Sequence, residues 1–208
     1  RFRSIVETQT DIISRHRPDG TLSFVNGEAC RFFGKKREEL LNRPFLPYTH
    51  EEDREFGTRN LASLTVQNPV IVNENRVMAP DGSVRWIQWT NQAFFDPQGR
   101  VTEIQAVGHD ITKRKLAEQA LADSTNYLDA IIDAIADPVF VKDSQYRFIL
   151  VNKALCTLTG IRREELIGRT DYDFFPKDQA DVFRAIDRKV LESGEENVNE
   201  ESITAAHQ

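Results

Sequence analysis

The sequence predicts an α+β chain with two domains in tandem, each built on one antiparallel five-stranded sheet with small helices on one face, and joined by a long helix. The first observation behind this prediction is a repeat. Residues 25–44 and 151–170 are two copies of one segment at a constant offset of 126, and nine of the 20 columns are identical. The second is the order of periods, because strand-like stretches are followed by short helical stretches and then by strands again. A repeat of this spacing is a whole domain used twice, since solenoid units are only about 20–50 residues long.

The first domain is predicted over residues 1–112. Pro18, Asp19 and Gly20 form a turn between two alternating stretches, which indicates a hairpin at its start. β-branched and aromatic residues dominate the later alternating stretches, as is typical of strands. Strands are expected at 11–17, 21–26, 70–78, 84–95 and 101–108, and helices at 28–33, 37–41 and 51–64.

A long helix over residues 113–136 is predicted to connect the two domains. The helical pattern runs from Ile111 to Pro138 without a breaker. A seven-residue spacing gives a seam of just over three heptads, formed by Arg114, Leu121, Leu128 and Ile135 together with Ala117, Ser124 and Ile131. The pattern favours a parallel coiled coil, and hence a homodimer through residues 111–137. Its apolar contacts are assigned to Leu121, Leu128, Ile131 and Ile135. The alternative is a single amphipathic helix that lies on the sheet of its own domain.

The second domain is predicted over residues 137–208. Asp143 and Ser144 mark the turn of its first hairpin, and a helix is expected at 178–192, ended by Gly194. A third strand is expected within 198–206. By analogy with the first copy, the last two strands lie beyond the sequence, so the domain is expected to be truncated and to expose an edge of its sheet.

Composition excludes several classes of function. The net charge is −6, and neither half has the basic surplus of a nucleic-acid-binding protein. No apolar stretch approaches the roughly 18–20 residues of a membrane span. The two cysteines, Cys30 and Cys156, occupy equivalent positions of the repeats, one in each domain, so they predict free thiols in a reducing cytoplasm. A cytoplasmic location is expected, with any membrane tether of the whole protein outside this stretch.

Several motifs together resemble the PAS domain family. In the first copy they are Asp19-Gly20, Val25-Asn26, Phe33-Gly34, Glu38-Glu39-Leu40, the turns that begin at Asp81 and Asp96, and the closing segment Gly108-His109-Asp110-Ile111-Thr112. In the second copy they are Thr159-Gly160, Gly168-Arg169 and the run from Asp171 to Pro176, which is similar to a PAS variant common in bacterial and archaeal sensor kinases. The resemblance covers nearly the whole chain.

The resemblance implies a sensory module of a bacterial or archaeal signal-transduction protein. Its sheet and helices are expected to enclose a cavity for a small molecule, and the helix that leaves the last strand is expected to carry a change to an effector domain or a dimer partner. The fragment itself carries no catalytic constellation and is not expected to be an enzyme, whereas the whole protein is expected to be a histidine kinase. The alternatives are a flavin-binding redox sensor and the input module of a cyclic-dinucleotide synthase.

Polar and aromatic residues of the strands and the first helix supply the candidate pocket wall. The wall is assigned to Asn26, Phe33, Asn73, Asn75, Trp86, Trp89 and Asn91. Because only every second residue of a strand faces inward, some of these are expected to point away from the pocket. For the aromatic residues the alternative is plain core packing.

The sequence does not identify a ligand, and it disfavours haem, a flavin photoadduct and a metal ion as cofactors. The resemblance implies that haem would need a histidine on the long helix, and residues 51–64 contain none. Light-sensing relatives place a reactive cysteine where residues 42–46 have none, which disfavours a flavin photoadduct. A redox flavin needs no cysteine and stays a disfavoured alternative. The four histidines, His16, His50, His109 and His207, show no metal-ligand spacing, so no metal site is predicted.

Signal coupling is assigned to the point where the last strand of the first domain gives way to the long helix. Asp110, Ile111 and Thr112 lie there, and the Asp110 carboxylate can accept hydrogen bonds from free amides at the start of the helix. We expect it also to pair with Arg85 across the sheet or with Arg114 one turn on. The alternative is an ordinary N-cap worth about 1 kcal/mol.

Overall fold

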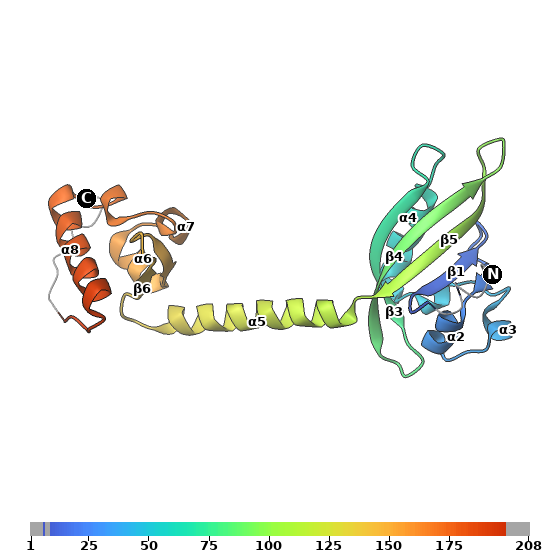
Figure 1. Cartoon of the computed structure of the whole chain (residues 1–208), viewed down its shortest axis with the longest axis horizontal. Coiled ribbons are helices and arrows are strands. Elements are labelled where there is room, and N and C mark those ends of the chain that lie inside the picture. The colour runs from blue at the N-terminus through green and yellow to red at the C-terminus, as the bar shows by residue number, and fades with distance from the viewer. Residues whose placement is uncertain (1–5, 7–8, 199–208) are drawn as a thin grey trace. The chain divides into compact units, whose positions relative to one another are not determined.

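The chain divides into two compact units, a first unit of residues 1–119 and a second unit of residues 120–208 (Figure 1). The structure is a computed structural model that describes residue 6 and residues 9–198. Each unit buries its own cluster of apolar side chains.

The first unit is built on a five-stranded antiparallel sheet in the order β2-β1-β5-β4-β3. The strands are β1 (Ile12–His16), β2 (Leu22–Val25), β3 (Val70–Met78), β4 (Val84–Phe95) and β5 (Val101–Asp110). Alternation sets the two faces, because Val77 and Ile87 are buried whereas Val72 and Val84 are exposed. The five predicted strands and the α+β class are therefore confirmed for this unit.

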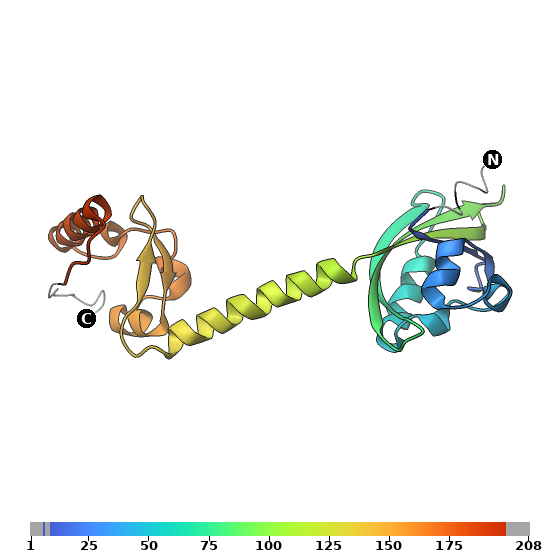
Figure 2. The same cartoon turned by 60° about the horizontal axis from the view of Figure 1, so that its bottom comes forward.

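Small helices cover one face of this sheet (Figure 2). They are α2 (Gly27–Phe33), α3 (Arg37–Leu40) and α4 (Arg54–Ala62), with the 3-10 turns η1 (Leu46–Tyr48) and η2 (Glu51–Asp53). Ala29 and Leu40 of the helices pack against Ile12, Val25 and Ile87 of the sheet. The helix expected over 51–64 is thus a 3-10 turn followed by a shorter α-helix, and the turn at η1 was not predicted.

Helix α2 ends at a position that only glycine fits. Gly34 has a φ of 60°, in the left-handed region. A Cβ atom there would also lie 2.9 Å from Cγ of Pro80, in the turn between β3 and β4. The glycine therefore lets the end of the helix approach that turn.

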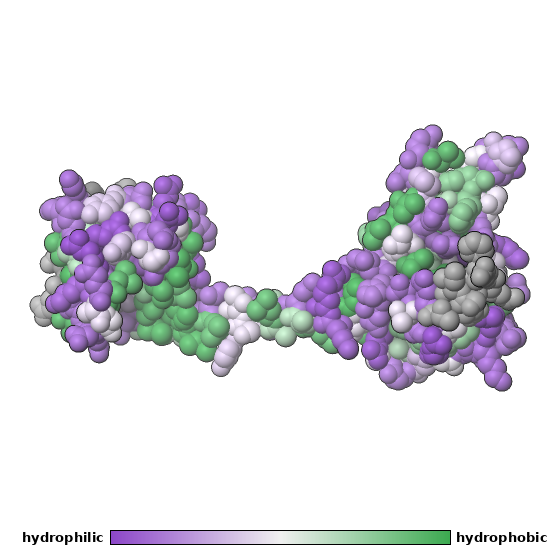
Figure 3. Space-filling view, in the orientation of Figure 1, coloured by the Kyte–Doolittle hydropathy of each residue, from purple (hydrophilic) through white to green (hydrophobic). Residues whose placement is uncertain are grey.

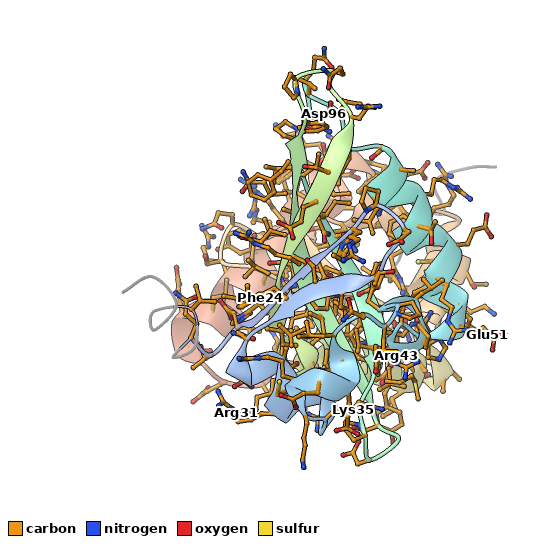
Figure 4. All side chains as sticks on the ribbon, turned by 90° about the vertical axis from the view of Figure 1, so that its right-hand side faces the viewer. Phe24, Arg31, Lys35, Arg43, Glu51 and Asp96 are labelled. Carbon is orange, nitrogen blue, oxygen red and sulfur yellow. The ribbon has the colours of Figure 1, made fainter. Side chains whose placement is uncertain are left out.

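Strands β4 and β5 are more than twice as long as β2, and they carry a small apolar cluster of their own. Leu64, Ala93 and Ile104 form this cluster. Asp96 lies at the tip of the hairpin that joins the two strands (Figure 4), where its carboxylate accepts hydrogen bonds from the backbone amides of Gln98 and Arg100, each at 2.9 Å. The hairpin is thus closed by an aspartate turn, as its sequence predicts.

Helix α5 (Thr112–Ala134) begins in the first unit and ends in the second. Its 23 residues confirm the long connecting helix. The helical pattern in the sequence runs on to Pro138, but the helix ends four residues earlier. Ile135, the last predicted residue of the seam, therefore lies just past the helix.

The second unit repeats the start of the first at the offset of 126. Its described elements are β6 (Phe140–Lys142), β7 (Phe148–Val151), α6 (Lys153–Thr159), α7 (Arg163–Leu166), η3 (Asp171–Asp173) and α8 (Lys177–Ser193). Strands β6 and β7 pair antiparallel. Gly194 ends α8, as predicted. The strand predicted within 198–206 lies outside the described residues, apart from Val198.

The core of the second unit uses the same positions as the core of the first. Phe148, Val151, Leu155 and Leu166 are buried there. They lie 126 residues after Leu22, Val25, Ala29 and Leu40, which are buried in the first unit. The shared pattern explains why the repeat is clearest in this part of the sequence.

Candidate functional site

A cavity lies between the sheet of the first unit and the helices that cover it. The space that the centre of a water molecule can reach inside it is about 70 Å³. One bound water needs only about 10–15 Å³ on this measure, so there is room for a molecule several times larger. The wall is mostly apolar and includes the aromatic side chains Phe33, Phe45, Tyr48 and Trp89. Its polar side chains include Ser14, His16, Arg54, Asn73, Asn75 and Asn91.

His16 contributes a neutral imidazole to this wall. Its side chain is buried, and the ring lies beside the ring of Phe45, with the centroids 4.7 Å apart. Burial lowers the pKa of His16. Nδ1 lies 3.0 Å from the carbonyl oxygen of Arg17, which can only accept, so Nδ1 carries the proton and Nε2 is left as an acceptor.

Three asparagines line the part of the cavity formed by β3 and β4. Asn91 Nδ2 donates a hydrogen bond to Asn73 Oδ1 at 2.9 Å. Asn75, two residues along β3 from Asn73, is 6% exposed. Its Oδ1 is buried and accepts no hydrogen bond from any residue that the structure describes. A buried acceptor without a donor is costly, which makes Asn75 the least satisfied group of the wall.

Gly108 lets the ring of Trp89 come close to the backbone of β5. A Cβ atom at Gly108 would lie 2.5 Å from the Trp89 ring. The two residues face each other directly across β4 and β5. The indole therefore lies against the bare backbone of β5 and forms part of the cavity wall there.

Five of the seven predicted pocket residues line the cavity: Phe33, Asn73, Asn75, Trp89 and Asn91. Trp86 does not, and its assignment is corrected. It lies three residues before Trp89 on the same strand, so its side chain points to the other face of the sheet. There its ring lies 5.7 Å from the Arg76 guanidinium and 5.3 Å from Lys115 Nζ.

The assignment of Asn26 to the pocket wall is also corrected, because its side-chain oxygen and nitrogen both form hydrogen bonds within the protein. The residue is fully buried and caps α2, with Oδ1 accepting from Ala29 N at 2.9 Å and from Ile13 N at 3.1 Å. Its Nδ2 donates to the carbonyl oxygens of Asp11 and Val6. Asn26 therefore holds three segments together and has nothing left to offer a ligand.

The start of α5 is hydrogen-bonded to the neighbouring strand β4. The backbone amide of Ile111 donates to the carbonyl oxygen of Trp86 at 2.9 Å. The amide of Trp86 donates to Thr112 Oγ1, also at 2.9 Å. Asp110 Oδ1 accepts from the amide of Thr112 at 2.8 Å, so its carboxylate caps the start of the helix. Asp110, Ile111 and Thr112 thus form one junction.

The cation partner predicted for Asp110 is wrong, because both candidate arginines bind elsewhere. Arg85 donates to Ser83 Oγ at 3.2 Å. Arg114 donates to Glu74 Oε1 on β3 at 2.6 Å, and Lys115 Nζ lies 2.7 Å from Glu74 Oε2. The hydrogen bonds from Lys115 and Arg114 lower the pKa of Glu74. Glu74 therefore ties the helix to the edge strand, and nothing in the local sequence pointed to this long-range contact.

A stripe of exposed apolar side chains runs along α5. Leu121 is 70% exposed and Leu128 is 56% exposed. Ile131 and Ile135 are also exposed, and the helix has no buried residue. Figure 3 shows hydrophobic surface along the helix. The residues assigned to a dimer seam are thus free to meet another surface.

The far end of α5 is fixed by Asn152, the counterpart of Asn26. Its Nδ2 donates to the carbonyl oxygens of Ile132, Ile135 and Asp137. Its Oδ1 accepts from the amides of Val139 and Leu155, each at 2.9 Å. Four of these five partners lie 126 residues after the partners of Asn26, so the repeat preserves the whole arrangement.

Asp133 adds a second attachment at the same end. Its carboxylate accepts a hydrogen bond from the amide of Lys153 at 2.9 Å and forms an ion pair with Arg163. Lys153 begins α6 and Arg163 begins α7. The last turn of α5 is therefore held by two helices of the second unit.

The interior of the second unit contains a group of charges that the sequence analysis missed. Lys142 Nζ lies 2.7 Å from Asp171 Oδ2 and 2.7 Å from Asp187 Oδ2. The side chains of Lys142 and Asp171 are 8% and 5% exposed. The ammonium also lies 4.9 Å from the centroid of the Phe148 ring and 5.2 Å from that of Phe140. The repeat offset was the available signal, because it aligns Lys142 with the inward-facing His16.

In this triad (Lys142, Asp171 and Asp187) one ammonium ion is shared by two carboxylates. Burial raises the pKa of Asp171, although the neighbouring Lys142 pulls it down. Three elements, β6, η3 and α8, meet at the triad. A cavity of about 50 Å³ on the same measure adjoins it, lined by apolar side chains that include Leu155 and Phe183.

Other sites are limited within the described part of the chain. Histidine, cysteine and acidic side chains nowhere gather there in a group of three that could hold a metal ion. None of its helices has the length and apolar character needed to cross a bilayer. Cys30 and Cys156 are both free and half-buried, and burial raises the pKa of the Cys156 thiol.

Two segments of the chain match protein families, both described as the PAS fold. One match covers residues 1–111 and the other residues 132–205. They fall on the two halves of the repeat.

The curated relatives include sensors of bacteria and archaea. An uncharacterized protein of Sinorhizobium fredii, y4lL, is 48% identical over 75 residues, which are 36% of this chain and 9% of that protein. The two-component sensor PprA of Pseudomonas aeruginosa is 30% identical over 59% of this chain and 13% of its own length. The methanogenesis regulatory histidine kinase FilI of Methanothrix harundinacea is 29% identical over 51% of this chain and 12% of its own. The chain thus spans a small part of these proteins.

Solved structures share the fold. A sensory box histidine kinase/response regulator from Burkholderia thailandensis is 25% identical, with a TM-score of 0.51 over 62% of this chain and 97% of that one. An RNA-binding light-oxygen-voltage receptor is 20% identical, with a TM-score of 0.52 over 60% of this chain and 36% of that one. The second likeness concerns the fold alone.

Proposed function

The chain belongs to the PAS fold family, and from that premise we propose that it is the input segment of a histidine kinase in which the first-unit cavity takes a small molecule and α5 carries the resulting change onward. The sensor kinases among its relatives agree with a signal-input role, and modules of this fold sense without catalysing. The kinase itself, and a cytoplasmic location, are parts of this proposal.

The observation that carries the proposal is the attachment of α5 at both ends. At its start, Thr112 accepts a hydrogen bond from the amide of Trp86 on β4, and Arg114 forms an ion pair with Glu74 on β3. These are the two strands that bring the asparagines to the cavity. A molecule that shifts either strand therefore shifts the start of the helix, and a switch needs such an element with two positions to bias.

At its other end the helix delivers that change to the second unit. Asn152 and Asp133 tie its last turn to β7, α6 and α7. A small rotation or shift of α5 would have to be absorbed by these contacts. We therefore place the coupling residues at Glu74, Asp110, Thr112, Asp133 and Asn152.

A second copy of the chain is the proposed partner of the exposed stripe on α5. The apolar residues recur at the spacing of a coiled-coil seam, and none of them is buried in the single chain. Leu128→Glu is expected to dissociate the dimer, because a charge at the seam loses its solvation on pairing. Ala122→Glu places the same charge on α5 outside the seam and is expected to leave the dimer intact. Equal dissociation constants for both variants in sedimentation equilibrium would contradict the seam.

The flavin alternative has little support from the cavity. The space of about 70 Å³ is what remains beside the Trp89 ring, and a three-ring isoalloxazine needs much more of it than a single ring does. The cyclic-dinucleotide alternative concerns a separate effector domain, and the relatives include a two-component sensor and a regulatory histidine kinase instead.

Native mass spectrometry of freshly purified protein, with an absorbance spectrum of the same sample, tests the proposal. A mass excess of one small molecule per chain, in a dimer, is the expected result. A bare chain that also binds nothing in a metabolite screen would remove the ligand from the proposal and leave a relay. A visible absorbance band would restore the flavin alternative.

A further inference from the structure

The wall of the first-unit cavity includes a buried acceptor that receives no hydrogen bond from the described residues. This acceptor is Asn75 Oδ1, whose residue lines the cavity between Asn73 and Val77 on β3. The nearby asparagines do not supply one, because Asn91 donates to Asn73. A ligand that places an O–H or N–H group here would remove the cost of the unpaired carbonyl.

Arg54 supplies the second observation. Of the described residues that line the cavity, it is the one with a formal charge, since the pKa of His16 is lowered. Its Nε donates to the carbonyl oxygen of Thr49 at 3.0 Å. The guanidinium takes part in none of the ion pairs found among the described residues.

The acidic residues next to Arg54 do not neutralise it. Asp53 and Glu52 both bind Arg76, at 2.6 Å and 2.9 Å. Glu51 is exposed at the surface near the start of α4 (Figure 4). The cavity therefore has a positive wall group without a matching carboxylate, which favours an anion.

The rest of the wall limits the shape of that anion. Phe33, Phe45, Tyr48 and Trp89 surround an apolar space, so the body of the ligand must be apolar, and flat rings pack well between such side chains. The volume limits it to a small molecule. With one cationic group in the wall, a single negative charge is matched and a second would be buried unpaired.

We propose that this cavity binds a small monocarboxylate with a flat apolar body and one hydroxyl or N–H donor, with the carboxylate on Arg54 and the donor on Asn75 Oδ1. The proposal rests on the sensory function given above, because it names the chemical class that the cavity senses.

Three probes that share one ring test it by calorimetry on the 208-residue protein. They are 4-hydroxybenzoate, which has both groups, benzoate, which lacks the donor, and 4-hydroxybenzamide, which lacks the charge. We expect 4-hydroxybenzoate to bind at least about tenfold more tightly than either of the others, the ratio that about 1.4 kcal/mol gives. The inference is overturned if the amide binds as tightly as the acid, or if none of the three binds.

Two variants assign the contacts. Arg54→Gln is expected to weaken 4-hydroxybenzoate at least about tenfold and to leave 4-hydroxybenzamide unchanged. Arg59→Gln is the matched control, since Arg59 lies on the same helix but is exposed and pairs with Glu55. Asn75→Leu is expected to melt no lower than the wild type, because it removes an unpaired carbonyl, and to bind 4-hydroxybenzoate and benzoate equally. A folded Asn75→Leu protein that still prefers 4-hydroxybenzoate would overturn the assignment.

Native mass spectra separate this inference from the function on which it rests. An uncharged molecule bound to the purified protein overturns the carboxylate and leaves the sensory role intact. A bare chain that binds neither a screened metabolite nor any of the probes removes both the carboxylate and the ligand.

Discussion

The two units place different chemistry at the same point of the same scaffold. The offset of 126 aligns His16 with Lys142 and Phe45 with Asp171. In the first unit the pair is a neutral imidazole beside an aromatic ring, 4.7 Å apart. In the second it is a buried ammonium ion 2.7 Å from a carboxylate.

The difference separates an interior with an unpaired acceptor from one whose charged groups pair with one another. Lys142 donates to Asp171 and Asp187, whereas Asn75 Oδ1 in the first unit accepts no hydrogen bond from the described residues. A buried ion pair is weak as a source of stability, because desolvation offsets most of the attraction, but breaking one is costly. The two units thus share a scaffold but differ in the side chains at this interior position.

The largest expected effect comes from removing the ammonium ion of the second unit. Lys142→Met leaves two carboxylates close together in the interior, so the second unit should lose about 3 kcal/mol of unfolding free energy. Both tryptophans of the chain, Trp86 and Trp89, lie in the first unit. In urea, the circular dichroism transition should therefore shift while the tryptophan fluorescence transition stays in place.

A double variant sharpens this test. Lys142→His together with Asp171→Phe gives the second unit the pair found in the first. Because it removes one buried carboxylate along with the ammonium, it should recover most of the lost stability. If the double variant is no more stable than Lys142→Met, the scaffold of the second unit does not accept the histidine–phenylalanine pair of the first.

The next effect concerns a residue that the two units share. Asn26→Ala and Asn152→Ala each strip two buried amides and two or more carbonyl oxygens of their partners. Each should cost its own unit about 2–3 kcal/mol. The tryptophan fluorescence transition should shift for Asn26→Ala, whereas for Asn152→Ala only the circular dichroism transition should shift. A loss below about 0.5 kcal/mol in either would show that water replaces the amide.

A pair of glycines gives a smaller and matched effect. Gly34 and Gly160 both end a helix with positive φ. A Cβ at Gly34 meets Pro80 at 2.9 Å, whereas nothing lies within 4 Å of one at Gly160. Gly160→Ala should cost about 1 kcal/mol of backbone strain, and Gly34→Ala about 1 kcal/mol more. Thermal unfolding of both variants checks this, and equal losses would mean that the β3–β4 turn yields.

The smallest effect is a difference in pH dependence. The pKa of His16 is lowered, so the unfolded chain takes up a proton near pH 6.5 before the folded unit does, and the first unit loses stability as the pH falls below that value. The pKa of Asp171 is raised, so the folded second unit takes up its proton first and gains stability as the pH falls through that raised value. Urea transitions at pH 7.5 and 5.0, followed by both signals, should shift apart. Parallel shifts would contradict the assignment.

Sequence periodicity was sufficient for the strands and for the part of the cavity wall that β3 and β4 supply. Asn73, Asn75, Trp89 and Asn91 share a parity that faces inward. The same alternation excludes Trp86 from the cavity wall if Trp89 is part of it, because residues three apart on a strand point to opposite faces of the sheet. The error at Trp86 was therefore avoidable.

Other features depend on contacts that no local pattern contains. Asn26 looked like a pocket residue because it is polar and ends a strand, but its partners come from three separate segments. Glu74 binds Arg114 across 40 positions of sequence. The Lys142–Asp171 pair spans 29 positions, and only alignment of the two copies could have marked it.

The hydrogen bonds of the Asn152 side chain determine where the chain can be truncated, or joined to another protein in a chimera, without loss of the second unit's framework. It donates to the carbonyl oxygens of Ile132 and Ile135, so a fragment that begins at residue 137 lacks part of its own framework. The second family match likewise begins at residue 132. The last turn of α5 belongs to the helix and to the unit behind it at once. A chimera made by exchanging input segments should therefore be joined upstream of that turn, within the exposed middle of the helix, so that neither neighbour inherits an incomplete end.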